Sequence, residues 1–337
     1  MARISAEDVV SAVREIGVLP QTMVTILRAF DNPDASTKDI AAVINRDISL
    51  TTRVLRMVNS VRYGRSRKVT RVSEAVRVMG LNSIKVLTLS SSIFGIKPDE
   101  KLFGQLNIKR IWRHFIETAV SASNIASECG YPDPEEAFIA GILHDIGIVL
   151  MLLHFRERYV EVVRGLEQNR KGIVSAEKEL LGFTHCEVGA QIAEGWKLPP
   201  RLIHVIRNHH DINSPAIIHI DAMLNDIIAT ADRIALGPFD YSSSGVEEDI
   251  LFTRKACAKL KMKSRVVNQI RKSSLMQSIE LAKYLELDAG DIIDILADAS
   301  NRLADLYYSL EQALVEESAM EEEVKSAAPV AAASPQQ

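Results

Sequence analysis

The stretch "GILHDIGIVL", residues 141–150, is apolar except for two adjacent polar residues, His144 and Asp145. Leu143 and Ile146 flank this pair, so a segment with the composition of a buried core contains an imidazole beside a carboxylate. Burying such groups costs several kcal/mol unless they are paired, hydrogen-bonded or bound to a metal ion. The pair therefore either has partners elsewhere in the chain or takes part in chemistry.

The surrounding sequence has the spacing of amphipathic helices. Apolar residues recur three and four positions apart in residues 37–58 and again in residues 72–79, where Gly80 is a natural helix end. Side chains that can cap a helix N-terminus precede two of these segments: Ser36 or Thr37, and Asp47 and Ser49. Strand-like alternation is scarce, so we expect an all-α protein.

Connector-like stretches divide this helical pattern into blocks. The chain has 337 residues, enough for about two domains, and residues 94–104 and 237–245 combine glycine, proline and polar residues. We expect an N-terminal helical lobe (residues 1–100), a second helical lobe (101–236) and a C-terminal helical extension (237–317). Residues 318–337, acidic and then rich in Pro, Ala and Ser, are expected to be a disordered tail.

The C-terminal extension contains a heptad pattern of about three repeats. Its apolar residues alternate in steps of four and three: Ile292, Leu296, Ala299, Leu303, Leu306, Leu310 and Ala313. Two interpretations remain open. The helix either docks on its own domain or pairs with a second copy in a homodimeric coiled coil, for which three repeats are the minimum.

The composition is that of a soluble globular protein, with 47% hydrophobic and 25% charged residues. A formal net charge of −4 provides no general attraction to nucleic acid or to an anionic membrane. Three distant cysteines cannot form a disulfide framework, which favours a reducing cytoplasm. The first 17 residues lack the apolar core of a signal peptide, and no run reaches about 18 apolar residues, so we expect no membrane span.

Histidines and aspartates, residue types that can bind transition metals, are concentrated in the second helical block. The candidate set comprises His114, His144, Asp145, His185, His209, His210 and Asp232. Helices of a bundle can bring such side chains to one interior point, and imidazole and carboxylate bind first-row transition metals. Asp145 could bridge two ions, and a bound ion would neutralise its buried charge. The other histidines, His154, His204 and His219, are expected to be core side chains with hydrogen-bond partners.

Several motifs, in this order and spacing, resemble the HDOD family of bacterial signal-transduction proteins, which are related to HD-domain metal-dependent phosphohydrolases. The resemblance extends from about Leu19 to Asp232 and includes "INRDISLTTRVLRMVNSVRYG", "VSEAVRVMGLNSIKVLTL", "AFIAGILHDIG" and "HCEVGAQIAEGWKLP". It implies an N-terminal helical lobe packed on an HD-like lobe. It also implies a role as a signalling output or adaptor, often beside cyclic-dinucleotide, chemotaxis or two-component systems.

By similarity to HD phosphohydrolases of the HD-GYP type, the seven candidate residues fill a complete metal-binding set. Two departures argue against catalysis of the HD-GYP kind. Those enzymes have a lysine where this chain has Ile148, so a cation that would stabilise developing phosphate charge is missing. Their Gly-Tyr-Pro signature after the histidine doublet is also absent, which puts hydrolysis of cyclic di-GMP in doubt.

A basic cluster in the N-terminal lobe is a second candidate site, for the phosphates of a nucleotide or nucleic acid. Its members are Arg62, Arg65, Arg67, Lys68 and Arg71. A solvated basic loop is the alternative interpretation. The preceding helices faintly suggest a helix-turn-helix, but residues 46–50 lack the glycine turn and no basic recognition face follows, so DNA binding is not expected.

The sequence indicates no serine or cysteine nucleophile. Cys186 follows His185 directly, but adjacency in sequence does not supply nucleophile–base geometry. A small buried hydrophobic residue is the expected role of Cys186.

Two functional hypotheses follow. In the first, the chain is a cytosolic signalling adaptor that binds an unidentified protein partner, and its metal site is structural or regulatory. In the second, it is a metal-dependent phosphohydrolase of a nucleotide or cyclic dinucleotide, in which Asp145 is indispensable and metal-bound water supplies hydroxide near neutral pH. The His/Asp set suits one or two ions of Fe, Mn, Zn or Ni.

Overall fold

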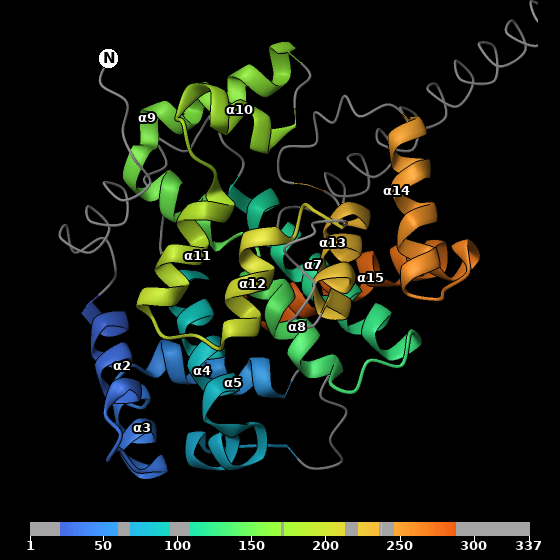
Figure 1. The fold of residues 1–337 in the computed structure, drawn as a ribbon. Helices are drawn as coiled ribbons and strands as arrows, with labels where there is room; N and C mark the ends of the chain where they lie inside the picture. The colour runs from blue at the N-terminus through green and yellow to red at the C-terminus, as the bar shows by residue number, and fades with distance from the viewer. Residues whose placement is uncertain are drawn as a thin grey trace, which may run out of the picture.

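The computed structural model describes residues 21–59, 68–94, 108–169, 172–212, 222–235, 237 and 246–287. Thirteen α-helices and no strand make up these residues, which confirms the all-α prediction. In Figure 1 the first helices form one end of the molecule, and α7, α8 and α11–α13 lie in the middle. Helices α9 and α10 project at the opposite end, and α14 and α15 cover one side.

In the described residues the N-terminal lobe contains four helices: α2 (Gln21–Asp31), α3 (Thr37–Ile44), α4 (Ile48–Val58) and α5 (Val72–Phe94). Two predicted caps are confirmed, because the side chain of Ser36 accepts a hydrogen bond from the first turn of α3 and that of Asp47 does the same for α4. Gly80 interrupts α5 with φ 81° and ψ 164°, a conformation that glycine adopts most readily. The expected helix end at Gly80 is thus a kink, after which the helix resumes.

The second lobe is built around α7 (Ile108–Glu128), which packs against α8 (Pro134–Leu143) and α13 (Ala222–Ile234). Its other helices are α9 (Ile146–Asn169), α10 (Ile173–Leu180), α11 (His185–Gly195) and α12 (Pro200–Asn208). After its first turn, helix α8 is buried on all sides from Ala137 to Leu143, as expected of a segment without a polar face. The pair His144–Asp145 therefore does not lie inside one long helix but in the turn between α8 and α9.

The C-terminal extension begins with α14 (Val246–Lys259) and α15 (Ser264–Tyr284). Helix α15 packs along α7, and α14 contacts α13, so this part of the extension lies on the second lobe. The predicted heptad pattern of residues 292–313 and the tail 318–337 lie outside the described residues. The domain boundaries and the dimeric coiled coil accordingly stay predictions.

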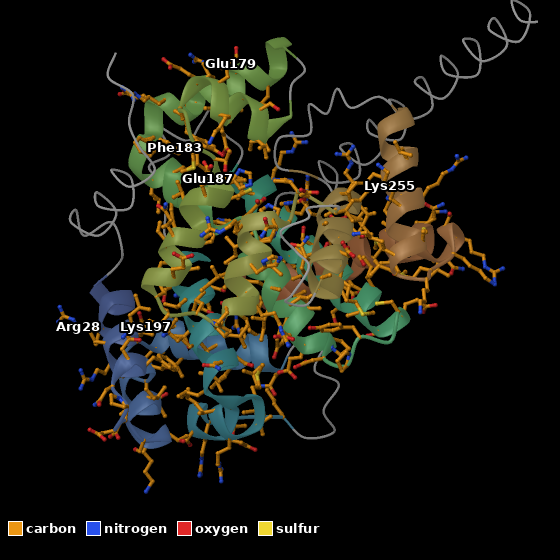
Figure 2. All side chains as sticks on the ribbon, viewed as in Figure 1. Arg28, Glu179, Phe183, Glu187, Lys197 and Lys255 are labelled. Atoms are coloured by element: carbon orange, nitrogen blue, oxygen red, sulfur yellow. The ribbon has the colours of Figure 1, made fainter. Side chains whose placement is uncertain are left out.

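Asp31 joins the two lobes through salt bridges. Its carboxylate oxygens lie 3.2 Å from Nζ of Lys85 on α5 and 3.1 Å from Nζ of Lys197, which follows α11. Figure 2 shows Lys197 at the boundary with the N-terminal helices. Helix α5 also packs against α8, so the N-terminal lobe supports the helix that leads into the His144–Asp145 turn.

Two glycines on either side of this turn permit close helix contacts. A Cβ atom on Gly141 would lie 2.6 Å from Cα of Ala119 on α7. A Cβ atom on Gly147 would lie 1.9 Å from the carbonyl oxygen of His185 at the start of α11. Both helices next to the turn can therefore approach their neighbours only because these two positions lack a side chain.

Among the described residues, one stretch is long and apolar enough to cross a membrane by length and composition alone: Pro134–Leu153. Within the structure, 89% of this stretch is buried, as in a core helix. It includes α8 and the start of α9, so its apolar character is accounted for by its central position in the second lobe.

Candidate metal centre

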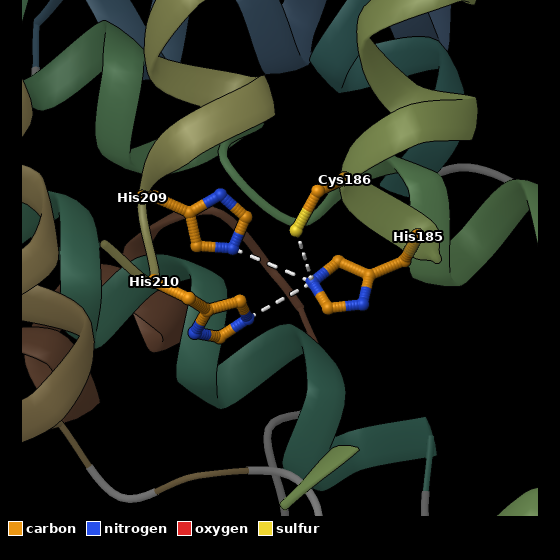
Figure 3. A group of neighbouring side chains, drawn as sticks. All are labelled: His185, Cys186, His209 and His210. Carbon is orange, nitrogen blue, oxygen red and sulfur yellow. Dashed lines mark hydrogen bonds between the residues drawn. The ribbon is translucent and has the colours of Figure 1, made fainter. Parts of the chain in front are cut away.

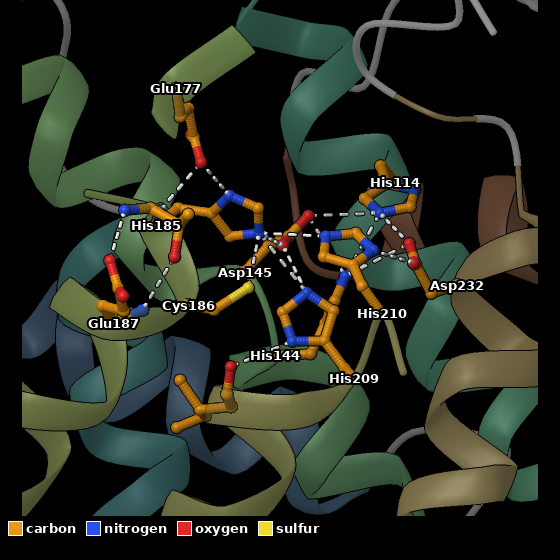
Figure 4. A network of polar contacts seen from close by, with 12 residues as sticks. His114, His144, Asp145, Glu177, His185, Cys186, Glu187, His209, His210 and Asp232 are labelled. Carbon is orange, nitrogen blue, oxygen red and sulfur yellow. Dashed lines mark hydrogen bonds and ion pairs between the residues drawn. The ribbon is translucent and has the colours of Figure 1, made fainter. Parts of the chain in front are cut away.

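The structure brings all seven predicted metal-binding residues together between α7, α8, α11, α12 and α13 (Figure 4). His114 comes from α7, and His185 is the first residue of α11. His209 and His210 form the turn after α12, and Asp232 lies near the end of α13. Four segments that are distant in sequence thus converge on the His144–Asp145 turn.

Four ligand atoms form the first cluster: Nε2 of His114, Nε2 of His144, Oδ2 of Asp145 and Oδ1 of Asp232. The five separations that involve a histidine nitrogen lie between 3.1 and 3.6 Å, and all four atoms lie within 4.8 Å of one another. The centre of a tetrahedron with such edges is about 2.0 Å from each corner, which is the usual length of a zinc–nitrogen or zinc–oxygen bond, about 2.0–2.2 Å. The first cluster therefore fits a divalent transition-metal ion in both donor type and size.

The second cluster contains His185, Cys186, His209 and His210 (Figure 3). Nε2 of His185 lies 3.4 Å from Nε2 of His209 and 3.1 Å from Nε2 of His210. These separations match those in the first cluster. Three imidazole nitrogens thus face one point, with the sulfur of Cys186 beside them.

Asp145 connects the two clusters. Its Oδ2 faces the first cluster, 3.1 Å from Nε2 of His144. Its Oδ1 faces the second, 3.2 Å from Nε2 of His185 and 3.1 Å from Nε2 of His209. The two oxygens of one carboxylate therefore point to two different cation positions, as the sequence suggested for Asp145.

Hydrogen bonds on the far side of the rings orient these histidines. An oxygen atom lies near Nδ1 in each of four rings: Gly141 O for His144 (2.8 Å), Ile206 O for His209 (3.0 Å), Glu177 Oε2 for His185 (2.7 Å) and Asp232 Oδ2 for His210 (3.4 Å). Because these oxygens only accept, Nδ1–H is the donor, so Nε2 is the nitrogen that faces the centre and becomes the ligand atom when it carries no proton. Metal-binding histidines are commonly held by this arrangement.

Ion pairs among the buried groups shift their pKa values. Burial disfavours the charged form of His114, but hydrogen bonds to Asp145 and Asp232 outweigh it and raise its pKa to about 9. The pKa of His144 rises to about 10 against the same burial effect, chiefly through the charge of Asp145. In turn, the histidines hold the pKa of Asp145 and Asp232 well below the usual value. Burial instead lowers the pKa of His209 to about 3.

The centre is buried on most sides and reaches solvent at one edge. Asp145 is 3% exposed, whereas the side chains of Asp232 and His210 are 15% and 32% exposed. Any substrate would therefore approach along the edge formed by Asp232 and His210.

Sequence reasoning missed Glu177 on α10. This carboxylate is fully buried and accepts hydrogen bonds from Nδ1 and the backbone N–H of His185 and from the hydroxyl of Tyr159. In the sequence it stands between Ala176 and Lys178 in "SAEKELLG", eight residues before His185, and nothing there distinguishes it from an exposed glutamate. The expectation for Cys186 was incomplete, since this residue is buried but its Sγ lies 3.3 Å from Nε2 of His185.

The other candidate residues are not part of this centre. Arg62, Arg65, Arg67 and His219 lie outside the described residues, as does the side chain of His154. Lys68 and Arg71 are exposed, which leaves the phosphate-binding prediction untested. His204 is partly buried near Asn208 and is absent from both clusters. Ile148 is 1% exposed and contributes to the hydrophobic core, so that position supplies no cation.

The curated relatives match only a part of their own length. The chain is 28% identical over 211 residues to an uncharacterized protein from Treponema pallidum, covering 61% of this chain and 40% of that protein. It is 26% identical over 181 residues to ribonuclease Y from Mycoplasma mycoides, covering 52% of this chain and 34% of the relative. The chain thus spans less than half the length of these relatives.

Solved structures share the fold over most of the chain. An HDOD domain protein from Geobacter sulfurreducens aligns with a TM-score of 0.54 and 23% identity, covering 83% of this chain and 99% of that one. A "putative phosphohydrolase" from Shewanella amazonensis SB2B aligns with a TM-score of 0.58 and 25% identity, covering 82% and 97%. A family model for the HDOD domain matches residues 16–212, more than half of the sequence. The chain belongs to the HDOD domain family.

Proposed function

We propose that this HDOD protein binds two divalent transition-metal ions and hydrolyses a phosphate ester at their shared centre. One observation supports the proposal above all: the two oxygens of Asp145 face two separate clusters of metal-binding atoms. If only one ion bound, one of the two oxygens of Asp145 would face a cluster of metal-binding atoms that holds no ion. The similarity to a ribonuclease Y and to a "putative phosphohydrolase" supports the choice of reaction class.

The ions would be held by His114, His144, Asp145 and Asp232 in the first cluster, and by Asp145, His185, His209 and His210 in the second. When bound, such a pair supplies a metal-bound hydroxide near neutral pH and charge stabilisation for phosphate oxygens. The chain's own contribution is to keep Nε2 of His144, His185 and His209 directed inward and to exclude water on the buried sides. Glu177 and the backbone carbonyls of Gly141 and Ile206 do the former.

A signalling adaptor is the second candidate function, and Ile148 favours it. This core residue stands where HD-GYP enzymes have a lysine, so the centre lacks that cation for a developing phosphate charge. In this alternative the ions have a structural or regulatory role, and the two lobes present a surface to a protein partner. A cytoplasmic location and an unidentified signalling partner belong to both proposals.

Metal content and turnover, measured on the same preparations, test both. We expect about two ions per chain, together with metal-dependent hydrolysis of at least one substrate from a panel of phosphomonoesters, nucleotides, cyclic dinucleotides and short RNA. His209→Gln should lose one ion and the turnover. The matched control is His204→Gln on α12, the helix that precedes His209; it should keep both because His204 lies outside the clusters.

The outcomes separate the two candidates. Two ions without turnover of any substrate would refute the hydrolase and support the adaptor. Failure to bind any ion, on purification or on addition of Zn²⁺, Mn²⁺ or Fe²⁺, would refute the metal centre and the hydrolase together.

A further inference from the structure

Cys186 lies beside the second cluster and points into it. It is the second residue of α11, it is 7% exposed, and its Sγ lies 3.3 Å from Nε2 of His185 (Figure 3). The Sγ atom and one ring nitrogen each of His185, His209 and His210 all lie within 4.8 Å of one another. The other two cysteines, Cys129 and Cys257, belong to neither cluster.

We propose that Cys186 binds the second ion through its sulfur, so that the two cation positions differ in donor chemistry. The first position would have only nitrogen and oxygen donors, whereas the second would have a thiolate beside its imidazoles. This inference rests on the metal binding in the proposed function but not on hydrolysis.

The distances fit a shared ion. With a zinc–sulfur bond of about 2.3 Å and a zinc–nitrogen bond of about 2.0–2.1 Å, a sulfur and a nitrogen that are neighbouring ligands of one ion are about 3.5 Å apart. The observed distance of 3.3 Å between Sγ of Cys186 and Nε2 of His185 is close to this value. It also resembles the nitrogen–nitrogen distances of 3.1 and 3.4 Å around the same ring nitrogen.

The local backbone holds the sulfur at the second cluster. Thr184 caps α11, so Cys186 lies in the first turn of that helix, directly after His185. Glu177 accepts from Nδ1 of His185, which leaves the Nε2 lone pair of that ring on the side of the sulfur. An ion between the two atoms would satisfy both.

The chemical step is a proton exchange without oxidation or reduction. The S–H bond of Cys186 breaks, its proton passes to water, and its electron pair remains on sulfur to form the metal–sulfur bond. A soft thiolate donor favours Zn²⁺, Co²⁺ or Fe²⁺ over Mn²⁺ at the second position. The centre would then select different ions at its two positions.

Cobalt spectroscopy on the reduced full-length chain tests this inference. Bound Co²⁺ gives visible d–d bands with any ligands, whereas a sulfur-to-cobalt charge-transfer band in the near-ultraviolet requires a thiolate. We expect that band in the wild type and in the double variant Cys129→Ala/Cys257→Ala, and its loss in Cys186→Ser. Cys186→Ser should keep the visible bands while binding one of two Zn²⁺ ions at least about tenfold more weakly.

Each result has one meaning. A charge-transfer band of wild-type strength in Cys186→Ser, or visible bands without that band in the wild type, would overturn the sulfur ligand and leave the proposed two-ion centre intact. The absence of visible bands in the wild type would overturn the two-ion centre and the sulfur ligand with it. Circular dichroism of Cys186→Ser, expected to match the wild type, excludes misfolding as the cause of a lost band.

Discussion

Glu177 should control the second cation position through His185. Its carboxylate accepts three hydrogen bonds: from Nδ1 of His185 at 2.7 Å, from the backbone N–H of His185 at 2.9 Å, and from the hydroxyl of Tyr159 at 2.6 Å. Glu177 lies on α10 and His185 begins α11, so these bonds both hold the imidazole and fix the start of the helix.

Glu177→Gln keeps the size of the side chain but removes its charge and one acceptor atom. A hydrogen bond to a charged group contributes about 1.5–3 kcal/mol and a neutral one about 0.5–1.5 kcal/mol. For three bonds that become neutral, we expect the free energy of unfolding to fall by about 3 kcal/mol. A loosened ring at His185 should weaken binding of the second ion by roughly 10- to 100-fold, the usual effect of losing such an orienting partner.

The assay is competition for Zn²⁺ with a chromophoric chelator, combined with urea unfolding of the same samples. Glu187→Gln is the matched control on the neighbouring helix, since its side chain caps α11 with Thr184 and pairs with Lys178 away from the clusters. Glutamine preserves that cap, so both measurements should stay near wild type. If Glu177→Gln lowers stability yet binds two ions with unchanged affinity, the role assigned to Glu177 in orienting His185 is wrong.

Two further predictions concern packing and protons. Gly147→Ala would place a Cβ atom 1.9 Å from the carbonyl oxygen of His185, so we expect the free energy of unfolding to fall by about 1–3 kcal/mol and ion binding to weaken. Gly172→Ala, which has open space around it, is the control and should change neither quantity. Calorimetric unfolding measures the stability and zinc titration the affinity, and unchanged values for Gly147→Ala would contradict the close contact. Because the pKa values of His114 and His144 are raised to about 9 and about 10, an ion must displace protons there, so Zn²⁺ affinity should rise as pH increases from 6.5 toward 9, by up to about tenfold per pH unit for each proton released. Titration calorimetry at pH 7.5 in two buffers of different ionisation enthalpy counts these protons, and a net release of zero would contradict the prediction.

The candidate ligand set could be predicted because it depends on residue type and order. Its histidines and aspartates are concentrated in one helical block, and the similarity to HD phosphohydrolases of the HD-GYP type supplied their order along the chain. The caps of α3 and α4 were likewise predictable, because Ser36 and Asp47 act on backbone groups within three residues. Local interactions of this kind depend only on residues that are close together in the sequence, so the sequence predicts them.

Features that depend on contacts between distant helices could not be predicted. Glu177 looks like its exposed neighbour Glu179 in the sequence, and only the packing of α10 against α9 buries it beside Tyr159. The direction of the Cys186 sulfur depends on where α11 starts relative to the turn after α12. The spacing of residues in the sequence does not give that relative position. Such residues are found from geometry, not from pattern.

The motif GILHDIG itself explains how the centre is assembled. Gly141 lets α8 approach α7, the helix of His114, and Gly147 lets α9 approach the start of α11, where His185 lies. Between these glycines, Asp145 directs Oδ2 toward His114 and Oδ1 toward His185. The close helix contact at each glycine thus brings the histidine of one cluster near one oxygen of Asp145. An apolar segment can contain a histidine and an aspartate here because the contacts at its two glycines place polar partners, His114 and His185, beside them.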